Sequence, residues 1–515
     1  MTGEFLEDNI GKIVKIKEKS ENIFVDEYVI VPDSISGIGK VVFVNLFPAD
    51  KGFSKVNAGI SVDGVLRYNI GYISDDPFSS IKILSGNINF EGFIRGDDFD
   101  CEDKYVNTGI TLEKVDYSVI NSKKISLNVA LNLNCIFCEW QYEKYLIDAN
   151  CGDNAQLLTN KFLASTLVDI KQQDFEVEET IQIPFEKDEI QDIAFSNISS
   201  YTSSFEEGTD GLTLKLDISA KIGYISTQGE LIVEDIQFQK EKIINLDNIP
   251  QGLKYIVTSQ LKDIEVQGVD DDDGELRVLE LRSKFESFIE VYEEIDFQYV
   301  QDAYFTDANE KIESQELEIL VNMHNYKKTL QLSSLYEGVG NFKDVYITNS
   351  NIDFNHSVNE KDILLNGTLN MRGILIPDSE DDSPKGIQIE LPFEETIQTD
   401  YDFDCTTDDI RLSLITEDVF ASCADEEKVE FNASLALEIT ILERKKILCA
   451  QDIEKIDTLD KEDESSSTIK LYYTKENEFL WDICKKYKIN KADITNVNEE
   501  IDFDNLAKGT MLLIP

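Results

Sequence analysis

The C-terminal stretch, residues 469–515, reads IKLYYTKENEFLWDICKKYKINKADITNVNEEIDFDNLAKGTMLLIP. Apolar residues alternate at its start, which is typical of a short strand. Four residues then recur at helical spacing: Leu480, Ile483, Cys484 and Tyr487. Asn490 is a favourable N-cap for a second helix, and a short apolar run follows Gly509 as a closing strand. The stretch therefore predicts a βααβ unit with a core that is only marginally sufficient for its size.

The order and spacing of these residues resemble a LysM domain. The residues that carry the resemblance are, in chain order, Leu480, Trp481, Lys485, Lys486, Tyr487, Ile489, Ile494, Asn498 and the closing GTMLLIP of residues 509–515. The resemblance implies binding of N-acetylglucosamine polymers, peptidoglycan or chitin. It also implies that the sugar contacts come from the loop before the first helix and the loop before the second strand.

The sequence departs from the LysM pattern in the first of these loops. The family's Gly-Asp-Thr is Asn477-Glu478-Phe479 here, and Lys508 replaces the family's Pro before Gly509. Asn tolerates a left-handed backbone conformation at small cost, whereas Phe479 has no hydroxyl with which to bind sugar or cap the helix. An exposed aromatic side chain suits a protein contact, so peptidoglycan is the less favoured ligand.

The predicted partner-binding residues of this module follow from the same reasoning. They are Ile469, Tyr473, Lys475, Asn477, Phe479, Trp481 and Lys485. Phe479 immediately precedes the inner stripe of the helix, so it is expected to be exposed. Trp481 is equally compatible with packing in the core of the module and with a partner contact.

The charge of the chain is strongly negative and unevenly distributed. The formal net charge is −53, so nucleic acid and anionic membrane surfaces are poor partners. The C-terminal module carries nearly equal numbers of lysines and acidic residues, so almost all of the excess lies before it. The module is therefore the part that least repels an acidic partner, although a small module also has little need of solubilising charge.

The sequence shows no export or membrane signal. Its start has no apolar segment of signal-peptide length, and no later run reaches the length of a membrane span. Eight cysteines scattered over 515 residues do not form a disulfide scaffold. We therefore expect a protein of the reducing cytoplasm that does not insert directly into a membrane.

Period-two alternation dominates the chain before the C-terminal module. The clearest runs are residues 124–134, 212–225 and 362–376, in which one face is apolar and the other polar. The fold is predicted to be mainly β, with tandem sandwich-like or barrel-like repeats. The expected organisation is an N-terminal arm at 1–22, β-rich domains at 23–152, 153–265 and 280–457, an acidic spacer at 266–279, a linker at 458–467 and the βααβ domain at 468–515.

Short motifs recur along this β-rich body. Residues 98–101 (DFDC) recur at 402–405, and Asn128 recurs as Asn432 at the same separation. Asn-Phe-Glu at 89–91 and Pro-Phe-Glu at 184–186 and 392–394 are interpreted as three copies of one joint. Because the repeats share joints and loops but no set of acids or nucleophiles, they indicate duplicated scaffolding.

The body resembles the spore-coat domain called SPOCS. The residues that carry this resemblance are GYISDD at 71–76, Ile376-Pro377-Asp378 and the Pro-Phe-Glu strand ends. SPOCS repeats followed by a terminal LysM domain are similar to the SipL family of coat morphogenetic proteins. That resemblance implies a non-enzymatic scaffold in the mother-cell cytoplasm at the forespore surface. It would bind the coat ATPase SpoIVA through the LysM domain, with other coat proteins as further partners.

No residue set predicts catalysis or a metal centre. His324 and His356 lie in unrelated patterns, and Cys135 and Cys138 form a single C-x-x-C pair that favours half-buried thiols over zinc. The acidic run 270–273 lacks the ligand spacing of an EF-hand, so a solvated spacer is favoured. We therefore expect no enzymatic activity, no metal and no cofactor. The alternative function is that of a cell-wall protein binding peptidoglycan or N-acetylglucosamine.

Overall fold

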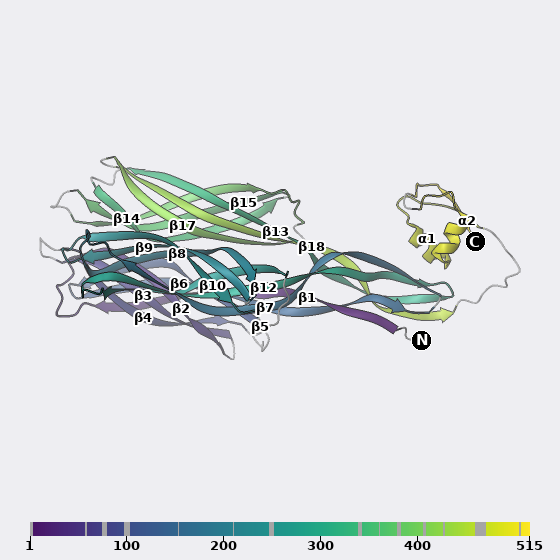
Figure 1. Cartoon of the computed structure of the whole chain (residues 1–515), viewed down its shortest axis with the longest axis horizontal. Coiled ribbons are helices and arrows are strands. Elements are labelled where there is room, and N and C mark those ends of the chain that lie inside the picture. Colours follow the sequence, from purple (N-terminus) through teal and green to yellow (C-terminus); the bar gives the residue numbers. More distant parts are fainter. Residues whose placement is uncertain are drawn as a thin grey trace.

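The computed structural model describes residues 4–515 except for 57–58, 75–79, 97–103, 153, 210, 247–251, 338–341, 360, 379–382, 405–407, 426–427, 459–469 and 504–505. The body before the C-terminal module consists of three copies of one six-stranded unit (Figure 1). The first copy contains β1 (Glu4–Ile30), β2 (Lys40–Val56), β3 (Gly59–Ile73), β4 (Lys82–Arg95), β5 (Lys104–Asn121) and β6 (Lys124–Asn150). The second contains β7 (Ala155–Gln182), β8 (Ile190–Gly208), β9 (Gly211–Ser226), β10 (Leu231–Ile244), β11 (Lys254–Asp270) and β12 (Leu276–Phe305). The third contains β13 (Ala308–Glu337), β14 (Phe342–Asn359), β15 (Asp362–Pro377), β16 (Lys385–Gln398), β17 (Asp409–Asp425) and β18 (Lys428–Thr458).

Each copy is a sandwich of two antiparallel layers. In the first copy β2, β3 and β4 form one layer in that order, and the other layer has the order β1-β6-β5. The second and third copies repeat both layers, and β7 and β13 join their outer layers into one six-stranded sheet. Alternate residues of β6, such as Ile125, Leu127 and Val129, are buried between the layers. The predicted mainly β fold is therefore confirmed, and period-two alternation produces it.

Six of the strands are much longer than a sandwich requires. They are β1, β6, β7, β12, β13 and β18, and they contain 27 to 31 residues. Their distal halves remain paired as β1–β6, β7–β12 and β13–β18, and together they form a stalk that extends from the sandwiches (Figure 1). The apolar faces of all three pairs meet in the stalk core, which includes Ile10, Tyr145, Phe297, Leu317 and Ile447. The stalk therefore needs all three copies, since an isolated two-stranded ribbon is at best marginally stable.

Ion pairs at related positions join neighbouring copies. A β-bulge in β11 presents Asp263 to the Arg67 guanidinium of β3, with distances of 2.9 and 3.0 Å between the paired atoms. A bulge at the related point of β17 presents Asp418 to Lys221 of β9, at 2.9 Å between Nζ and Oδ1. In each case the extra residue of the bulge bends the strand and directs the following aspartate side chain toward the neighbouring copy. A β-bulge followed by an aspartate that pairs with a basic residue thus connects the first copy to the second and the second to the third.

Gly11 allows two ribbons of the stalk to approach closely. Its N–H donates to Thr166 Oγ1 of β7 at 2.8 Å, and a Cβ at position 11 would overlap the Leu167 carbonyl oxygen. Because that oxygen belongs to the backbone, it cannot turn aside as a side chain would.

We expect Gly11→Ala to destabilise the protein by about 1–3 kcal/mol, the usual cost of overpacking. Urea unfolding of the full chain measures this, with Gly208→Ala as the control because the nearest atom to a Cβ there lies at 3.5 Å. Equal midpoints for the two variants would contradict a close crossing at Gly11.

Several predicted domain ranges differ from the structure. Residues 4–22 are not a separate arm but the distal part of β1, because they pair with residues 132–150 of β6. Residues 266–279 are not a mobile spacer: β11 and β12 pair directly, and Asp271 Oδ1 accepts the N–H groups of Asp273 and Glu275 in the turn between them. The second copy therefore continues to Phe305 instead of ending near residue 265.

The predicted recurrent motifs have mixed outcomes. Asn128 and Asn432 occupy the related strands β6 and β18, and the Phe-Glu pairs at 90–91 and 393–394 occupy the related strands β4 and β16. The Pro-Phe-Glu of 184–186 lies in the turn between β7 and β8, so it is not a third copy of that joint. Residues 98–101 lie outside the described part of the chain, as does most of the predicted linker.

The C-terminal module has the predicted βααβ order. It contains β19 (Lys470–Tyr473), α1 (Leu480–Tyr487), α2 (Lys491–Val497) and β20 (Met511–Ile514). Its core includes Leu480, Ile483 and Cys484, with Tyr487 partly buried against them, which confirms the inner face inferred from the helical spacing. Ile494 of α2 and Leu512 of β20 complete the core. Within the described residues, no helix is both long and apolar enough to cross a membrane.

Candidate partner-binding site

The loop between β19 and α1 is held by one carboxylate. Glu478 accepts the Tyr472 hydroxyl at 2.5 Å through Oε1 and the Lys475 N–H at 2.8 Å through Oε2. Burial alone would raise the pKa of Glu478, but the Tyr472 hydrogen bond and the Lys475 backbone and charge lower it overall. Asn477 adopts a left-handed backbone conformation with φ of 58°, as its replacement of Gly predicts. The loop is therefore a defined structure whose tip is set by Asn477 and Glu478.

Phe479 projects from the end of this loop into solvent. It is the N-cap residue of α1, and its side chain is 70% exposed. The Asp482 carboxylate accepts the Phe479 N–H at 3.2 Å, and the Asp482 N–H donates to the Phe479 carbonyl at 3.1 Å instead of to a side-chain hydroxyl at position 479. Tyr473, Lys475 and Asn477 are also exposed, whereas Ile469 lies outside the described residues. The structure thus places four of the predicted partner-binding residues on one accessible segment.

The second loop approaches the first through an ion pair. Lys508, which replaces the family's Pro, lies with its Nζ 3.1 Å from Glu476 Oε2. Both side chains are exposed, so the pair contributes little to stability. It nevertheless joins the two loops that hold sugar in the resembling family, at a point where both have changed.

Trp481 and Lys485 face the stalk of their own chain. The Trp481 indole Nε1 donates to Asp302 Oδ2 at 2.7 Å, and the Lys485 ammonium donates to Asp302 Oδ1 at 2.6 Å. Asp302 belongs to β12 near the stalk tip. These two predicted residues are therefore separated in role from Phe479, since they join the module to the body.

Two stalk residues that the sequence did not single out complete this contact. Tyr304 is fully buried, donates its hydroxyl to the Ile489 carbonyl at 2.7 Å and packs edge-on against Trp481 with ring centroids 4.9 Å apart. Burial raises the pKa of the Tyr304 phenol, so it remains a donor. Glu310 pairs with Lys488. Nothing in the alternation of β12 and β13 distinguishes Tyr304 or Glu310 from other strand residues, so no sequence signal pointed to them.

A match to a known family decides the nature of the module. The family model of the LysM domain matches residues 472–515. The C-terminal module is a LysM domain. The comparisons with curated proteins and with solved structures give no match for the chain. The similarity of the three-copy body to SPOCS therefore stays a prediction, and the LysM domain is the part whose family is shown.

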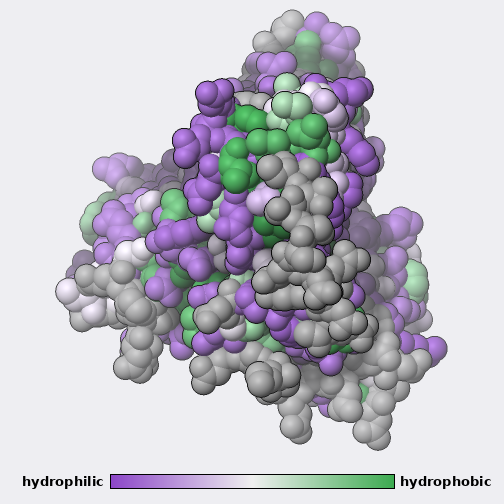
Figure 2. Space-filling view, turned by 90° about the vertical axis from the view of Figure 1, so that its right-hand side faces the viewer, coloured by the Kyte–Doolittle hydropathy of each residue, from purple (hydrophilic) through white to green (hydrophobic). Residues whose placement is uncertain are grey.

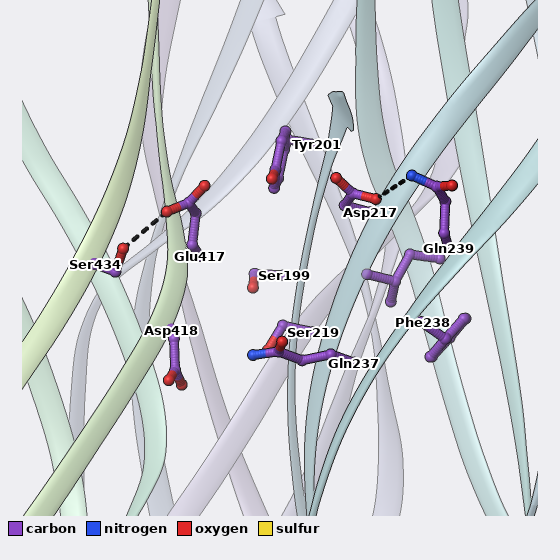
Figure 3. A pocket seen from close by; sticks show the side chains of 11 residues that line it. Ser199, Tyr201, Asp217, Ser219, Gln237, Phe238, Gln239, Glu417, Asp418 and Ser434 are labelled. Atoms are coloured by element: carbon purple, nitrogen blue, oxygen red, sulfur yellow. Dashed lines mark hydrogen bonds between the residues drawn. The ribbon is translucent and has the colours of Figure 1, made fainter. Parts of the chain in front are cut away.

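A polar cleft between the second and third copies is an alternative candidate site. Its volume is about 560 Å³, and β8, β9, β10, β17 and β18 line it (Figure 3). Gln239 donates to Asp217 at 2.7 Å and Ser434 donates to Glu417 at 2.8 Å, so both carboxylates are already hydrogen-bonded. Burial and these two carboxylates raise the pKa of Tyr201, which keeps its hydroxyl protonated. The third carboxylate of the lining, Asp418, lies with its Oδ1 2.9 Å from Lys221 Nζ.

His324, Cys135 and Cys138 lie on the long strands β13 and β6 of the body, and His356 of β14 is exposed. His324 Nε2 lies 3.1 Å from Glu443, and its ring packs on Tyr401. Cys135 is buried, and burial raises the pKa of its thiol to about 12, which opposes formation of a reactive thiolate. Cys138 is half-buried. Among the described residues no group of His, Cys, Asp or Glu has the arrangement of a metal site.

Proposed function

We propose that this protein is a non-enzymatic scaffold in spore-coat assembly whose LysM domain binds the coat ATPase SpoIVA. The observation that carries the proposal is the 70% exposed Phe479 at the position where the LysM pattern has a sugar-binding Thr. A phenyl ring offers no hydrogen bond to a sugar hydroxyl, whereas exposed aromatic residues are frequent anchors of protein interfaces. The protein would act in the mother-cell cytoplasm at the forespore surface.

The shape and charge of the chain support a scaffold. Three copies of one unit form an elongated body, and the LysM domain lies at the stalk end (Figure 1). The body carries nearly all of the excess negative charge, which opposes non-specific association with other acidic surfaces. The LysM domain is close to neutral and is therefore the surface best suited to contact an acidic protein. Other coat proteins are candidate ligands of the body.

Glycan binding is the second candidate function. The LysM match favours it, because the resemblance implies recognition of N-acetylglucosamine polymers. Against it stand the loss of the Thr hydroxyl at Phe479 and the Lys508–Glu476 pair between the loops. Peptidoglycan is therefore retained as the competing ligand in the test.

Replacement of Phe479 separates the two functions. We expect the full-length chain to bind purified SpoIVA, and Phe479→Thr to weaken that binding by at least about tenfold, as for an interface hot spot. Biolayer interferometry measures this, and sedimentation with purified peptidoglycan measures glycan binding in parallel. Phe185→Thr is the matched control, because Phe185 is 71% exposed but lies in the body.

Two results would overturn the protein-binding proposal. One is co-sedimentation with peptidoglycan at micromolar affinity together with no measurable binding to SpoIVA. The other is SpoIVA binding that Phe479→Thr leaves equal to that of the Phe185→Thr control.

A further inference from the structure

The two strands of the LysM domain have different free edges. β19 and β20 pair only with each other, with Leu471 opposite Leu513 and Tyr473 opposite Met511. The Asn498 side chain donates to the Leu513 carbonyl at 2.8 Å and accepts the Leu513 N–H at 2.8 Å. The Asn498 amide therefore satisfies both outward backbone groups of Leu513, as a neighbouring strand would.

This arrangement fixes the direction of the backbone groups on β19. Because Leu513 directs its N–H and C=O to Asn498, it forms a non-hydrogen-bonded pair with Leu471. The N–H and C=O of Leu471 must then point away from β20, and those of Tyr473 do the same two residues later. The Thr474 N–H, by contrast, donates to the Thr510 carbonyl at 3.0 Å, as the alternation requires. Within the described residues, the outward groups of Leu471 and Tyr473 have no hydrogen-bond partner.

The side chains beside this edge are apolar and accessible. Leu471 is 58% exposed and Tyr473 is 61% exposed, and both lie on the same outer face because they are two residues apart on a strand. Figure 2 views the molecule from the end that carries the LysM domain and shows apolar side chains among the polar surface there. An exposed edge with apolar residues invites pairing with another strand unless it is protected.

We infer that the outer edge of β19 binds an extended segment of a partner protein by β-strand addition. The outward groups at Leu471 and Tyr473 have the spacing that a paired strand satisfies, and the exposed side chains of these two residues select apolar residues at alternate positions of that segment. Lys470 begins β19, is exposed and has no ion-pair partner among the described residues, so an acidic residue of the segment fits beside it. Asp302 and Tyr304 of the stalk contact Trp481 and Ile489 of the module, whereas the side chains of Leu471 and Tyr473 on β19 remain exposed.

The inference rests on the proposed function, since it takes the ligand to be a protein, but it is tested separately. Leu471→Pro removes one outward N–H and suits an edge strand, because this N–H is not used in the ladder. Met511→Pro is the matched control, since it removes the corresponding outward N–H from β20. Leu471→Lys combined with Tyr473→Lys keeps the backbone intact and blocks the same edge with charge.

Two probes are used on the full-length chain. A displayed library of random peptides is selected on the unmodified chain, and purified SpoIVA is tested in parallel. We expect selected peptides with alternating apolar residues and an acidic flank, and at least about tenfold weaker binding of peptides and SpoIVA by both edge variants. Met511→Pro is expected to bind both probes like the unmodified chain.

The outcomes distinguish the two proposals. Edge-dependent peptides without SpoIVA binding would uphold strand addition and reject SpoIVA as the partner. SpoIVA binding that survives both edge variants, or a selection that yields no peptide sensitive to them, would overturn strand addition at β19.

Discussion

Tyr304→Ala is expected to release the LysM domain from the stalk tip. Tyr304 is the stalk residue that enters the core of the LysM domain, beside Leu480, Ile483 and Cys484. Truncation of a buried aromatic residue costs about 3–5 kcal/mol through lost burial and the cavity that remains. The variant also loses the hydrogen bond to the Ile489 carbonyl and the ring contact with Trp481. A loss of that size changes the equilibrium between docked and undocked forms by about two to four powers of ten.

Small-angle scattering of the full chain measures this release. We expect the radius of gyration to increase, because an undocked LysM domain samples the length of its tether. Trp481 fluorescence is expected to shift as the indole leaves Asp302 and enters water. Tyr142→Ala is the control, since Tyr142 lies in a long stalk strand but is exposed. Scattering curves that coincide for the two variants would show that Tyr304 does not hold the domain.

This docking explains which parts of the site were predictable from the sequence. The LysM fold could be predicted because its signals are local: the spacing of Leu480, Ile483 and Cys484 marks the first helix, and the N-cap residue Asn490 marks the start of the second. The exposure of Phe479 followed from the same helical period. The positions of Trp481 and Lys485 could not be predicted, since their partner Asp302 is remote in sequence and resembles every other polar residue on an alternating strand.

The body shows the same division between local and remote information. Alternation predicted strands correctly, as in β6, because each strand encodes its own two faces. The extent of the copies was not predictable from composition. The acidic run before Leu276 has the composition of a spacer, yet Asp271 uses its charge to accept two backbone N–H groups in a tight turn. The polar N-terminal residues of β1 also look unstructured until β6 supplies their hydrogen-bond partners.

Arg411→Met is expected to destabilise the body strongly. Arg411 of β17 in the third copy pairs with Glu290 of β12 in the second copy, and Glu290 is only 2% exposed. The Tyr292 hydroxyl donates to the same carboxylate at 2.5 Å. Burial opposes the charge of Arg411, but Glu290 and Asp409 outweigh it and hold the pKa of Arg411 above its usual value. The cluster is therefore a charged contact between copies in which the Glu290 carboxylate is buried, whereas the Arg411 side chain is 32% exposed.

Removal of Arg411 leaves the Glu290 charge buried with a single neutral donor. Breaking a buried ion pair in this way costs about 3–5 kcal/mol, mostly because the remaining charge has lost its hydration without compensation. The midpoint of urea unfolding measures the loss. Arg282→Met is the matched control. Arg282 lies on β12, the strand of Glu290, and pairs with Glu178 at 3.4 Å, but both side chains are exposed. We therefore expect its free energy of unfolding to change by no more than about 0.5 kcal/mol. Addition of Glu290→Gln to Arg411→Met removes the buried charge and should recover part of the lost stability. If the double variant is less stable than Arg411→Met alone, the loss arises from packing of the arginine side chain rather than from the unpaired carboxylate.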